Sequence, residues 1–160
     1  GYEAREPMVK IEVGPWTALR DGASQVRAEV VEHEQGIAAE MASDESDPGA
    51  VHALARNRLG QPVATARLLQ HEPGVGRVGR MAVNRVLRGS HLGRDVLRAL
   101  LEVAAMRGDQ EVCLYAQRRA EEFYLLQGFR PRGEPFEEAG ISHIEMAMPL
   151  LKATAPQNVA

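Results

Sequence analysis

The sequence is poor in cysteine, lysine and aromatic residues, and it has no long apolar run. The scarcity of cysteine and the lack of long apolar runs each exclude a class of protein. Cys113 is the single cysteine among 160 residues, so no intrachain disulfide can form and a disulfide-stabilised secreted scaffold is excluded. No apolar run is long enough to cross a bilayer, and residues 1–7 lack the apolar segment of a signal peptide. We therefore expect a cytoplasmic protein with no membrane partner.

Common nucleotide and metal motifs are also missing. No G-x-G-x-x-G follows the first strand-like run, and no G-x-x-x-x-G-K-[ST] occurs, which disfavours a dinucleotide fold and P-loop chemistry. The histidines have no spacing typical of metal ligands, so we expect no bound metal. They are His33, His52, His71, His91 and His143.

The composition that is present is typical of one globular domain, with 44% hydrophobic and 26% charged residues. We expect residues 1–150 to form a single domain and 151–160 a frayed tail. The net charge is −3, but residues 29–47 hold seven acids and no basic residue, whereas residues 77–98 hold six arginines and one acid. Arginine suits phosphate recognition, and 17 of the 19 basic residues are arginine. A bias in composition also explains this excess of arginine over lysine. We expect no nucleic-acid partner.

Apolar spacing predicts the order of the elements. Steps of three and four residues indicate helices, and alternation between turn residues indicates strands. The predicted order is strand 8–13, helix 16–33, a short helix or ordered loop over 34–49, strands 50–57, 62–69 and 77–83, helix 92–107, strand 110–117, helix 119–127, and strands 129–133 and 141–150. This order predicts an α/β domain with antiparallel and parallel pairings in one sheet.

The loop before the second long helix is a candidate anion site. It reads Arg88-Gly89-Ser90-His91-Leu92-Gly93-Arg94 and leads directly into the helix. The first turn of a helix leaves backbone N–H groups without intrahelical partners and carries partial positive charge. The loop therefore predicts binding of a phosphate or pyrophosphate group.

The order of elements and several short motifs resemble the GNAT superfamily of acyl-CoA-dependent N-acyltransferases, and within it the ElaA/YjcF-type branch. The motifs are Glu34-Gln35-Gly36, Asp44-x-x-Asp47, Val51-His52, Gly79-Arg80-Met81-Ala82-Val83, Gln117, Phe123-Tyr124, Gly128-Phe129 and Gly140-Ile141-Ser142-His143. The resemblance implies a mixed, mostly antiparallel sheet of about six to seven strands, splayed between two parallel strands and flanked by about four helices.

The resemblance also implies an acetyl-CoA site and direct transfer in a ternary complex. The pyrophosphate would lie on the loop, the pantetheine would pair with the strand from 81 to 83, and the amide of Val83 would polarise the thioester. Tyr124 would protonate the departing thiolate, or it packs in the core. Gln117 contacts the cofactor or caps a helix. The implied cofactor-binding residues are Met81, Ala82, Val83, Arg88, Gly89, Ser90, His91, Leu92, Gly93, Arg94, Gln117 and Phe123.

His91 departs from the family pattern R/Q-x-x-G-x-G/A, in which its position is glycine. If the backbone there is left-handed, a side chain costs about 1–2 kcal/mol, although histidine tolerates this conformation better than most residues. We expect weakened but surviving cofactor binding.

An amine acceptor needs a base, because an ammonium ion has no lone pair. We prefer Glu34 as this base. The acidic residues Glu34, Asp44 and Asp47 either bind a cationic amine or form solvated acidic surface. His52 and His143 either line the acceptor pocket or make structural hydrogen bonds. The expected acceptor is a primary amine of a polyamine, an amino sugar or a protein, and a homodimer is compatible with the resemblance. A non-catalytic CoA-binding module is the alternative function.

Overall fold

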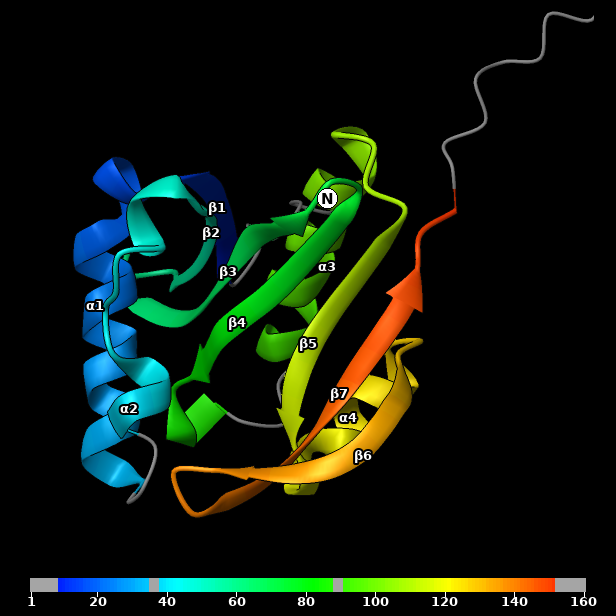
Figure 1. The fold of residues 1–160 in the computed structure, drawn as a ribbon. Coiled ribbons are helices and arrows are strands. Elements are labelled where there is room, and N and C mark those ends of the chain that lie inside the picture. Colours follow the sequence, from blue (N-terminus) through cyan, green and yellow to red (C-terminus); the bar gives the residue numbers. More distant parts are fainter. Residues whose placement is uncertain (1–8, 35–37, 88–90, 152–160) are drawn as a thin grey trace, which may run out of the picture.

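The computed structural model describes residues 9–34, 38–87 and 91–151, so the predictions for Arg88, Gly89, Ser90 and the tail lie outside the described residues. Within these ranges the chain forms seven strands and four α-helices, of which α2 is a single turn (Figure 1). The elements are β1 (Val9–Pro15), α1 (Trp16–His33), α2 (Ala38–Met41), β2 (Val51–Asn57), β3 (Pro62–Glu72), β4 (Val75–Val83), α3 (Leu92–Met106), β5 (Glu111–Gln117), α4 (Glu121–Leu126), β6 (Arg130–Glu138) and β7 (Ile141–Pro149).

The strands form one mixed sheet in the order β1-β2-β3-β4-β5-β7-β6. Every neighbouring pair is antiparallel except β4 and β5, which run parallel and pair only from Val75 to Arg77 of β4. Beyond Arg77 the two strands diverge, and the gap between them widens towards their C-terminal ends (Figure 1). The predicted mixed and splayed sheet is confirmed.

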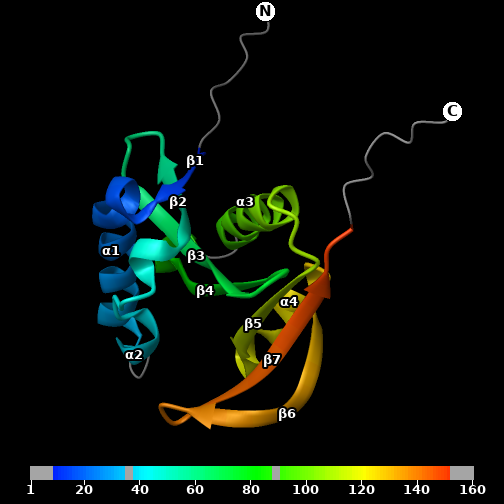
Figure 2. The ribbon, with the colours of Figure 1, turned by 45° about the horizontal axis from the view of Figure 1, so that its top comes forward.

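The helices lie on both faces of the sheet. Helix α1 packs against one face of β2, β3 and β4, and α3 packs against the other (Figure 2). The alternation of strand side chains explains this division: Leu54 of β2 joins the core beneath α1, whereas its neighbours Ala53 and Ala55 join the core beneath α3. The second core also contains Tyr124 of α4, so α3 and α4 share a face.

The predicted helical stripes are buried as expected. In α1 they are Trp16, Leu19, Ala23, Val26 and Val30, and in α3 they are Leu92, Val96, Leu97, Leu100 and Ala104. Helix α4 ends at Leu126, and Gly128 follows it with a φ of +103°, which allows its N–H and that of Phe129 to bond back into the last turn. Gly128 therefore helps to end the helix.

Strand β6 differs from the sequence prediction. It continues to Glu138 rather than ending at residue 133, because its pairing with β7 resumes after a register shift between Arg132 and Phe136. The described part of segment 34–49, for which the sequence predicts a short helix or ordered loop, contains α2 and a 3₁₀ turn at Asp47–Gly49. Both segments place polar residues beside the gap between β4 and β5.

Candidate active site

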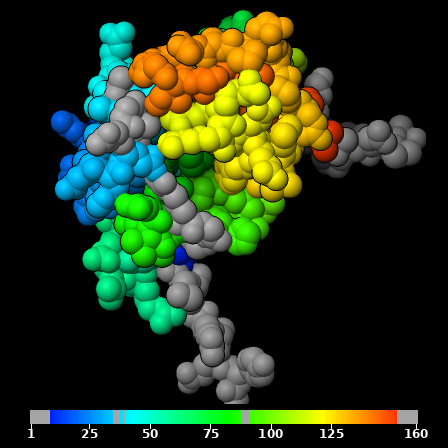
Figure 3. Space-filling model, turned by 90° about the horizontal axis from the view of Figure 1, so that it is seen from below, coloured from blue at the N-terminus to red at the C-terminus, as the bar shows by residue number. Residues whose placement is uncertain are grey.

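A cavity of about 1120 Å³ opens where β4 and β5 diverge. Its walls come from α1, α2, β4, α3, β5, α4 and the β6–β7 hairpin. Figure 3 shows this hollow between the blue atoms of α1 and the yellow atoms of α4. The cavity passes from the α3 and α4 face of the sheet to the opposite face, and its two sides differ in chemistry.

The start of α3 forms one end of the cavity. His91 is the N-cap, with φ 65° and ψ 12°, and is therefore in the left-handed conformation that the motif glycine would adopt freely. His91, Leu92, Gly93 and Arg94 all line the cavity. A Cβ on Gly93 would lie 3.5 Å from Phe123 Cζ, so the helix start and α4 approach closely there. The first turn of α3, where backbone N–H groups lack intrahelical partners, therefore borders the cavity.

Strand β4 supplies the adjacent wall through its main chain. The N–H of Asn84 donates to the Val63 carbonyl of β3 at 2.8 Å. Successive strand amides point in opposite directions, so the N–H of Val83 points away from β3, towards the side where β5 has diverged. Met81, Ala82 and Val83 all line the cavity. This edge is available to an extended ligand that replaces the missing strand pairing.

Tyr124 lies deep in the wall formed by α4. Its ring packs edge-on against Phe123 and Phe129, with centroids 4.9 and 5.9 Å away, and only 8% of the residue is exposed. Burial raises the pKa of its phenol to about 12, so the phenol is protonated at neutral pH. Tyr124 also lines the cavity, so it is both a core residue and part of the cavity wall.

Strand β4 bends at Arg80, a second residue with a left-handed backbone, with φ 53°. The β3–β4 register shifts there, between the pairs Arg67–Gly79 and Thr65–Ala82. The Arg80 side chain donates to the Ala42 carbonyl and to an Asp44 carboxylate oxygen, both at 2.9 Å. These bonds tie the bend in β4 to the segment that follows α2.

A chain of buried ion pairs continues from Arg80 into the core. Arg67 bonds to both Asp44 and Asp47, at 2.6 to 3.0 Å, and Arg27 of α1 donates two bonds of 3.0 Å to Asp47. Burial alone would raise the pKa of Asp47, but the bonds from Arg27 and Arg67 outweigh it and hold the pKa below its usual value. Asp47 is fully buried by these partners.

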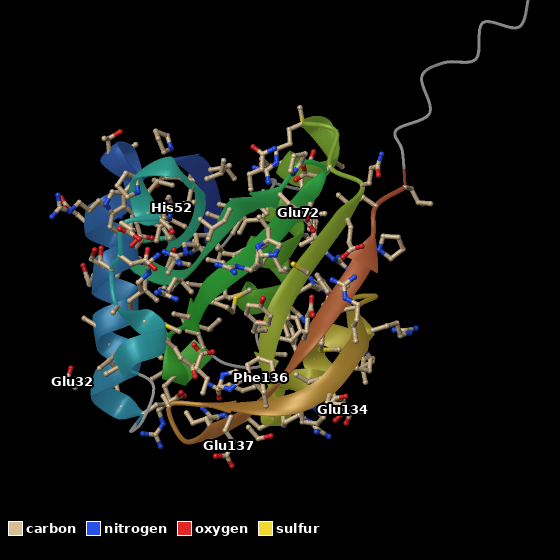
Figure 4. The ribbon with its side chains drawn as sticks, viewed as in Figure 1. Glu32, His52, Glu72, Glu134, Phe136 and Glu137 are labelled. Carbon is tan, nitrogen blue, oxygen red and sulfur yellow. The ribbon has the colours of Figure 1, made fainter. Side chains whose placement is uncertain are left out.

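The prediction that Asp47 and His52 line the acceptor pocket is corrected by these positions, because neither residue lies in the cavity wall. His52 is buried beside Trp16, with ring centroids 4.7 Å apart, and its Nε2 lies 2.9 Å from the Asp47 carbonyl oxygen. Burial lowers the pKa of His52 and keeps the ring neutral. Figure 4 shows His52 near α1, well away from Phe136 at the other end of the sheet.

Asp44 lines the cavity, but it is engaged by two arginines rather than open to a cation. The hydrogen bond from Arg67 lowers the pKa of Asp44. Three arginines surround Asp44 and Asp47, namely Arg27, Arg67 and Arg80, so this part of the acidic zone carries no net negative charge. The two aspartates fix the loop to the sheet.

A second polar network crosses the cavity mouth. Arg119 bonds to Glu34 at 3.2 Å and to Gln117 at 2.8 Å, and Gln117 donates to Glu40 at 2.8 Å. The other carboxylate oxygen of Glu40 lies 2.9 Å from Nε2 of His143. The network therefore joins the α1–α2 side of the cleft to β5 and β7, and all five residues line the cavity.

Sequence reasoning missed Glu40. It lies in the acidic zone but in a segment without a clear period, and its partners Gln117 and His143 are far along the chain. The pairing of Gln117 with His143 across β5 and β7 brings these partners together. Only a correct sheet order would have revealed this cluster.

Cys113 is buried, and burial raises the pKa of its thiol, so it is unsuited to act as a nucleophile. Across the described ranges, no group of three or more His, Cys, Asp or Glu side chains gathers as metal ligands would. No helix in those same ranges is both long and apolar enough to cross a membrane.

Comparisons with known proteins agree with this geometry. The sequence profile of the acetyltransferase (GNAT) domain matches residues 20–150. Protein ElaA of Escherichia coli K12 is 38% identical over 96 residues, which are 57% of this chain and 61% of ElaA, so the match spans about three fifths of that relative. The uncharacterized N-acetyltransferase YjcF of Bacillus subtilis is 33% identical over 129 residues, 80% of this chain and 90% of YjcF.

Solved structures give the same result. A protein from Lactobacillus plantarum superposes with a TM-score of 0.81 at 30% identity, covering 91% of this chain and 100% of that chain. The crystal structure of Escherichia coli ElaA superposes with a TM-score of 0.76 at 28% identity, covering 88% of this chain and 99% of that chain.

Proposed function

The chain belongs to the GNAT family of acetyltransferases, and we propose that it transfers an acetyl group from acetyl-CoA directly to a primary amine. The observation that supports this most is the open edge of β4 beside the start of α3. That edge offers main-chain groups to an extended pantetheine arm, and the helix start offers N–H groups to a pyrophosphate.

The proposed cofactor site uses mostly main chain. In the proposal, residues 88–94 hold the pyrophosphate, and Met81, Ala82 and Val83 hold the pantetheine. The Val83 N–H points to the thioester carbonyl and stabilises the negative charge that develops on its oxygen. Gln117 and Phe123 border the cofactor.

In the proposed reaction a base, for which we propose Glu34, takes one proton from the ammonium directly or through water and later gives it to solvent. The amine nitrogen then attacks the thioester carbon, the carbon–sulfur bond breaks, and the thiolate takes a proton from Tyr124. The nitrogen loses its second proton as the amide forms, and that proton is returned to the Tyr124 phenolate through water. The raised pKa of Tyr124 ensures that this proton is present at the start of each cycle.

The acceptor pocket of the proposal keeps Asp44 and His143, with Glu40 added, and excludes Asp47 and His52. We also propose that the protein is cytoplasmic and forms a homodimer.

The first test is thermal unfolding with saturating acetyl-CoA. A ligand at 100 times its Kd stabilises by about 2.7 kcal/mol, which raises the midpoint by several degrees at roughly 2–4 °C per kcal/mol. Gly93→Asp is the control, because a carboxylate in the first turn is compatible with the helix but repels a pyrophosphate. We expect a shift in the wild type and none in the control.

The second test is amine-dependent release of CoA, followed with a thiol reagent. Cys113 is only 1% exposed, so the folded protein contributes little background. Release that requires an amine supports transfer. A thermal shift without release, across a broad amine panel, would instead support the non-catalytic CoA-binding module. Absence of any shift in folded protein would overturn both.

A further inference from the structure

Glu40 carries a buried carboxylate oxygen that receives no hydrogen bond from the described residues. Its Oε2 accepts a bond from Gln117, whereas its Oε1, although 2.9 Å from Nε2 of His143, has no hydrogen-bond partner among the described residues. A buried carboxylate oxygen without a donor is unfavourable, and an ammonium group carries three donors. Because the Glu40 side chain is 18% exposed and Glu40 lines the cavity, its carboxylate group is suited to receive the nitrogen of the acceptor.

His143 is fixed in place beside Glu40. Its Nδ1 lies 2.7 Å from the Ile141 carbonyl oxygen, and its ring stacks on Phe136 with centroids 5.7 Å apart and an interplanar angle of 20°. Phe136 is the register partner of His143 in the β6–β7 pair, which places both side chains on one face of the sheet. The contact between Glu40 and His143 therefore continues directly into an aromatic surface.

Two partly exposed rings form this surface. Tyr115 of β5 meets Phe136 edge-on, with centroids 5.6 Å apart. Tyr115 is 45% exposed and Phe136 is 36% exposed, although both line the cavity. Figure 4 shows Phe136 beside the end of β5. Large apolar groups left exposed inside a polar cleft are typical of a ligand-binding surface.

The far end of the aromatic surface is cationic. The guanidinium of Arg77 lies 5.5 Å above the Tyr115 ring, and within the part of the chain that the structure describes it has no carboxylate partner. The cavity is therefore anionic at Glu40, aromatic at Phe136 and Tyr115, and cationic at Arg77. A second ammonium group, as in a polyamine, would lie against Arg77 and be repelled.

We propose that the acceptor is an arylalkyl monoamine, whose ammonium binds Glu40 and whose ring packs against Phe136 and Tyr115. This inference rests on the proposed function, since it concerns the same cavity. A neutral or anionic group on the far side of the ring is favoured by Arg77. The acceptor class thus differs from the polyamines that the acidic zone of the sequence favours.

The experiment compares four amines at saturating acetyl-CoA: 2-phenylethylamine, 2-cyclohexylethylamine, 4-(2-aminoethyl)benzoate and spermidine. We expect kcat/KM to be highest for the two aromatic amines and lowest for spermidine. Aromatic contacts of this kind correspond to about three- to tenfold in affinity, so Phe136→Leu lowers kcat/KM for 2-phenylethylamine by about that factor. Because Arg77 favours an anionic group, we expect kcat/KM to be higher for 4-(2-aminoethyl)benzoate than for 2-phenylethylamine. This difference disappears in Arg77→Gln.

Glu40→Gln tests the ammonium contact. Loss of one partner of a desolvated charge pair predicts a rise in KM of about 30-fold or more for every amine, with KM for acetyl-CoA unchanged. Glu137→Gln is the matched control, because Glu137 adjoins Phe136 on β6, points to the other face and lies outside the cavity wall. It is expected to leave both KM values unchanged.

Equilibrium binding separates failure of this inference from failure of the proposed function. Calorimetry measures 2-phenylethylamine binding to the complex with free CoA, in the wild type and in Phe136→Leu. Binding that weakens in the variant, without any CoA release in turnover, supports the acceptor site and overturns transfer. Efficient acetylation of spermidine with no effect of Phe136→Leu supports transfer and overturns the inference. Absence of aromatic amine binding also overturns the inference.

Discussion

The two sides of the cleft between β4 and β5 differ in their chemical groups, since one is formed mainly by the main chain and the other by side chains. The side beneath α3 and α4 uses residues that are consecutive in short stretches of sequence, chiefly 81–83 and 91–94. Its proposed contacts come from backbone N–H groups and a helix start. The opposite side uses side chains from α2, β4, β5, β6 and β7, and nearly all of its polar groups are paired with another charge.

The difference teaches where each side is sensitive to substitution. A main-chain site depends on backbone conformation and tolerates most changes of side chain. A side-chain site depends on its individual ion pairs, because each removal leaves a partner charge in a partly desolvated environment. Substitutions that leave the backbone unstrained should therefore affect the two sides very differently.

The largest loss of stability is expected at Asp47, which anchors the side of the cleft opposite α3 and α4. We call it the acceptor side, because the amine is proposed to bind there. Asp47→Asn leaves the guanidinium groups of Arg27 and Arg67 buried without their shared carboxylate. Breaking a buried pair in this way costs about 3–5 kcal/mol, a large part of the stability of an ordinary domain. Urea denaturation measures the loss of the free energy of unfolding.

Glu145→Gln is the control for that experiment. Arg132 bonds to Glu145 at 2.7 Å, closer than the Arg27–Asp47 contact of 3.0 Å, but Arg132 is 47% exposed. Exposed pairs contribute about 0.2–1 kcal/mol, so a small loss is expected. Equal losses in the two variants would show that burial does not decide the strength of these pairs.

Acid should weaken the same anchor in the wild type. The pKa values of Asp44 and Asp47 are lower in the folded chain than the ordinary value of about 3.9. The unfolded chain therefore binds more protons as the pH falls, so the stabilisation is complete above about pH 5 and is lost progressively below it. Urea midpoints measured between pH 6 and pH 2.5 should fall in the wild type and fall less in Asp47→Asn. Parallel curves for the two proteins would contradict this account.

On the cofactor side, the one side chain with a strong expected effect is Tyr124. Tyr124→Phe keeps the ring packing against Phe123 and Phe129 but removes the proposed proton donor. We expect kcat to fall about 10²-fold, with KM for acetyl-CoA and the melting temperature nearly unchanged. Steady-state kinetics and thermal unfolding measure the two effects. Full activity in the variant would leave Tyr124 with a packing role only.

The contrast between the two sides also explains what the sequence could reveal. Helix α3 and the strand from 81 to 83 follow from local patterns of apolar residues and turn residues, whereas the left-handed start at His91 is suggested only by the glycine of the family pattern. Local physics is enough there, because the groups that bind are part of the backbone. The splay of β4 from β5 came from the family resemblance, since no local pattern specifies where a parallel pairing stops.

The acceptor side followed from no local pattern. Asp47 and His52 looked like pocket residues because acids and histidines are common in active sites, yet Arg27 and Arg67 enclose Asp47 in the core. Glu40 gave no signal of its own, since its role depends on partners from β5 and β7. Contacts between residues so far apart depend on sheet order, register and side-chain rotamers together, which a single sequence does not specify.

The smallest and sharpest test replaces with glycine two of the residues that have a left-handed backbone, one on each side of the cleft. His91 and Arg80 have φ of 65° and 53°, so glycine relieves a similar backbone strain of about 1–2 kcal/mol at each position, partly offset by greater freedom of the unfolded chain. His91 makes no capping bond with its side chain, whereas the Arg80 side chain donates hydrogen bonds to Asp44 and to the Ala42 carbonyl.

His91→Gly should therefore leave the free energy of unfolding equal or slightly higher and tighten acetyl-CoA binding. Arg80→Gly should lower stability and raise KM for the amine more than KM for acetyl-CoA. If both variants behave alike, backbone strain rather than side-chain pairing controls the two sides, and the contrast between them fails.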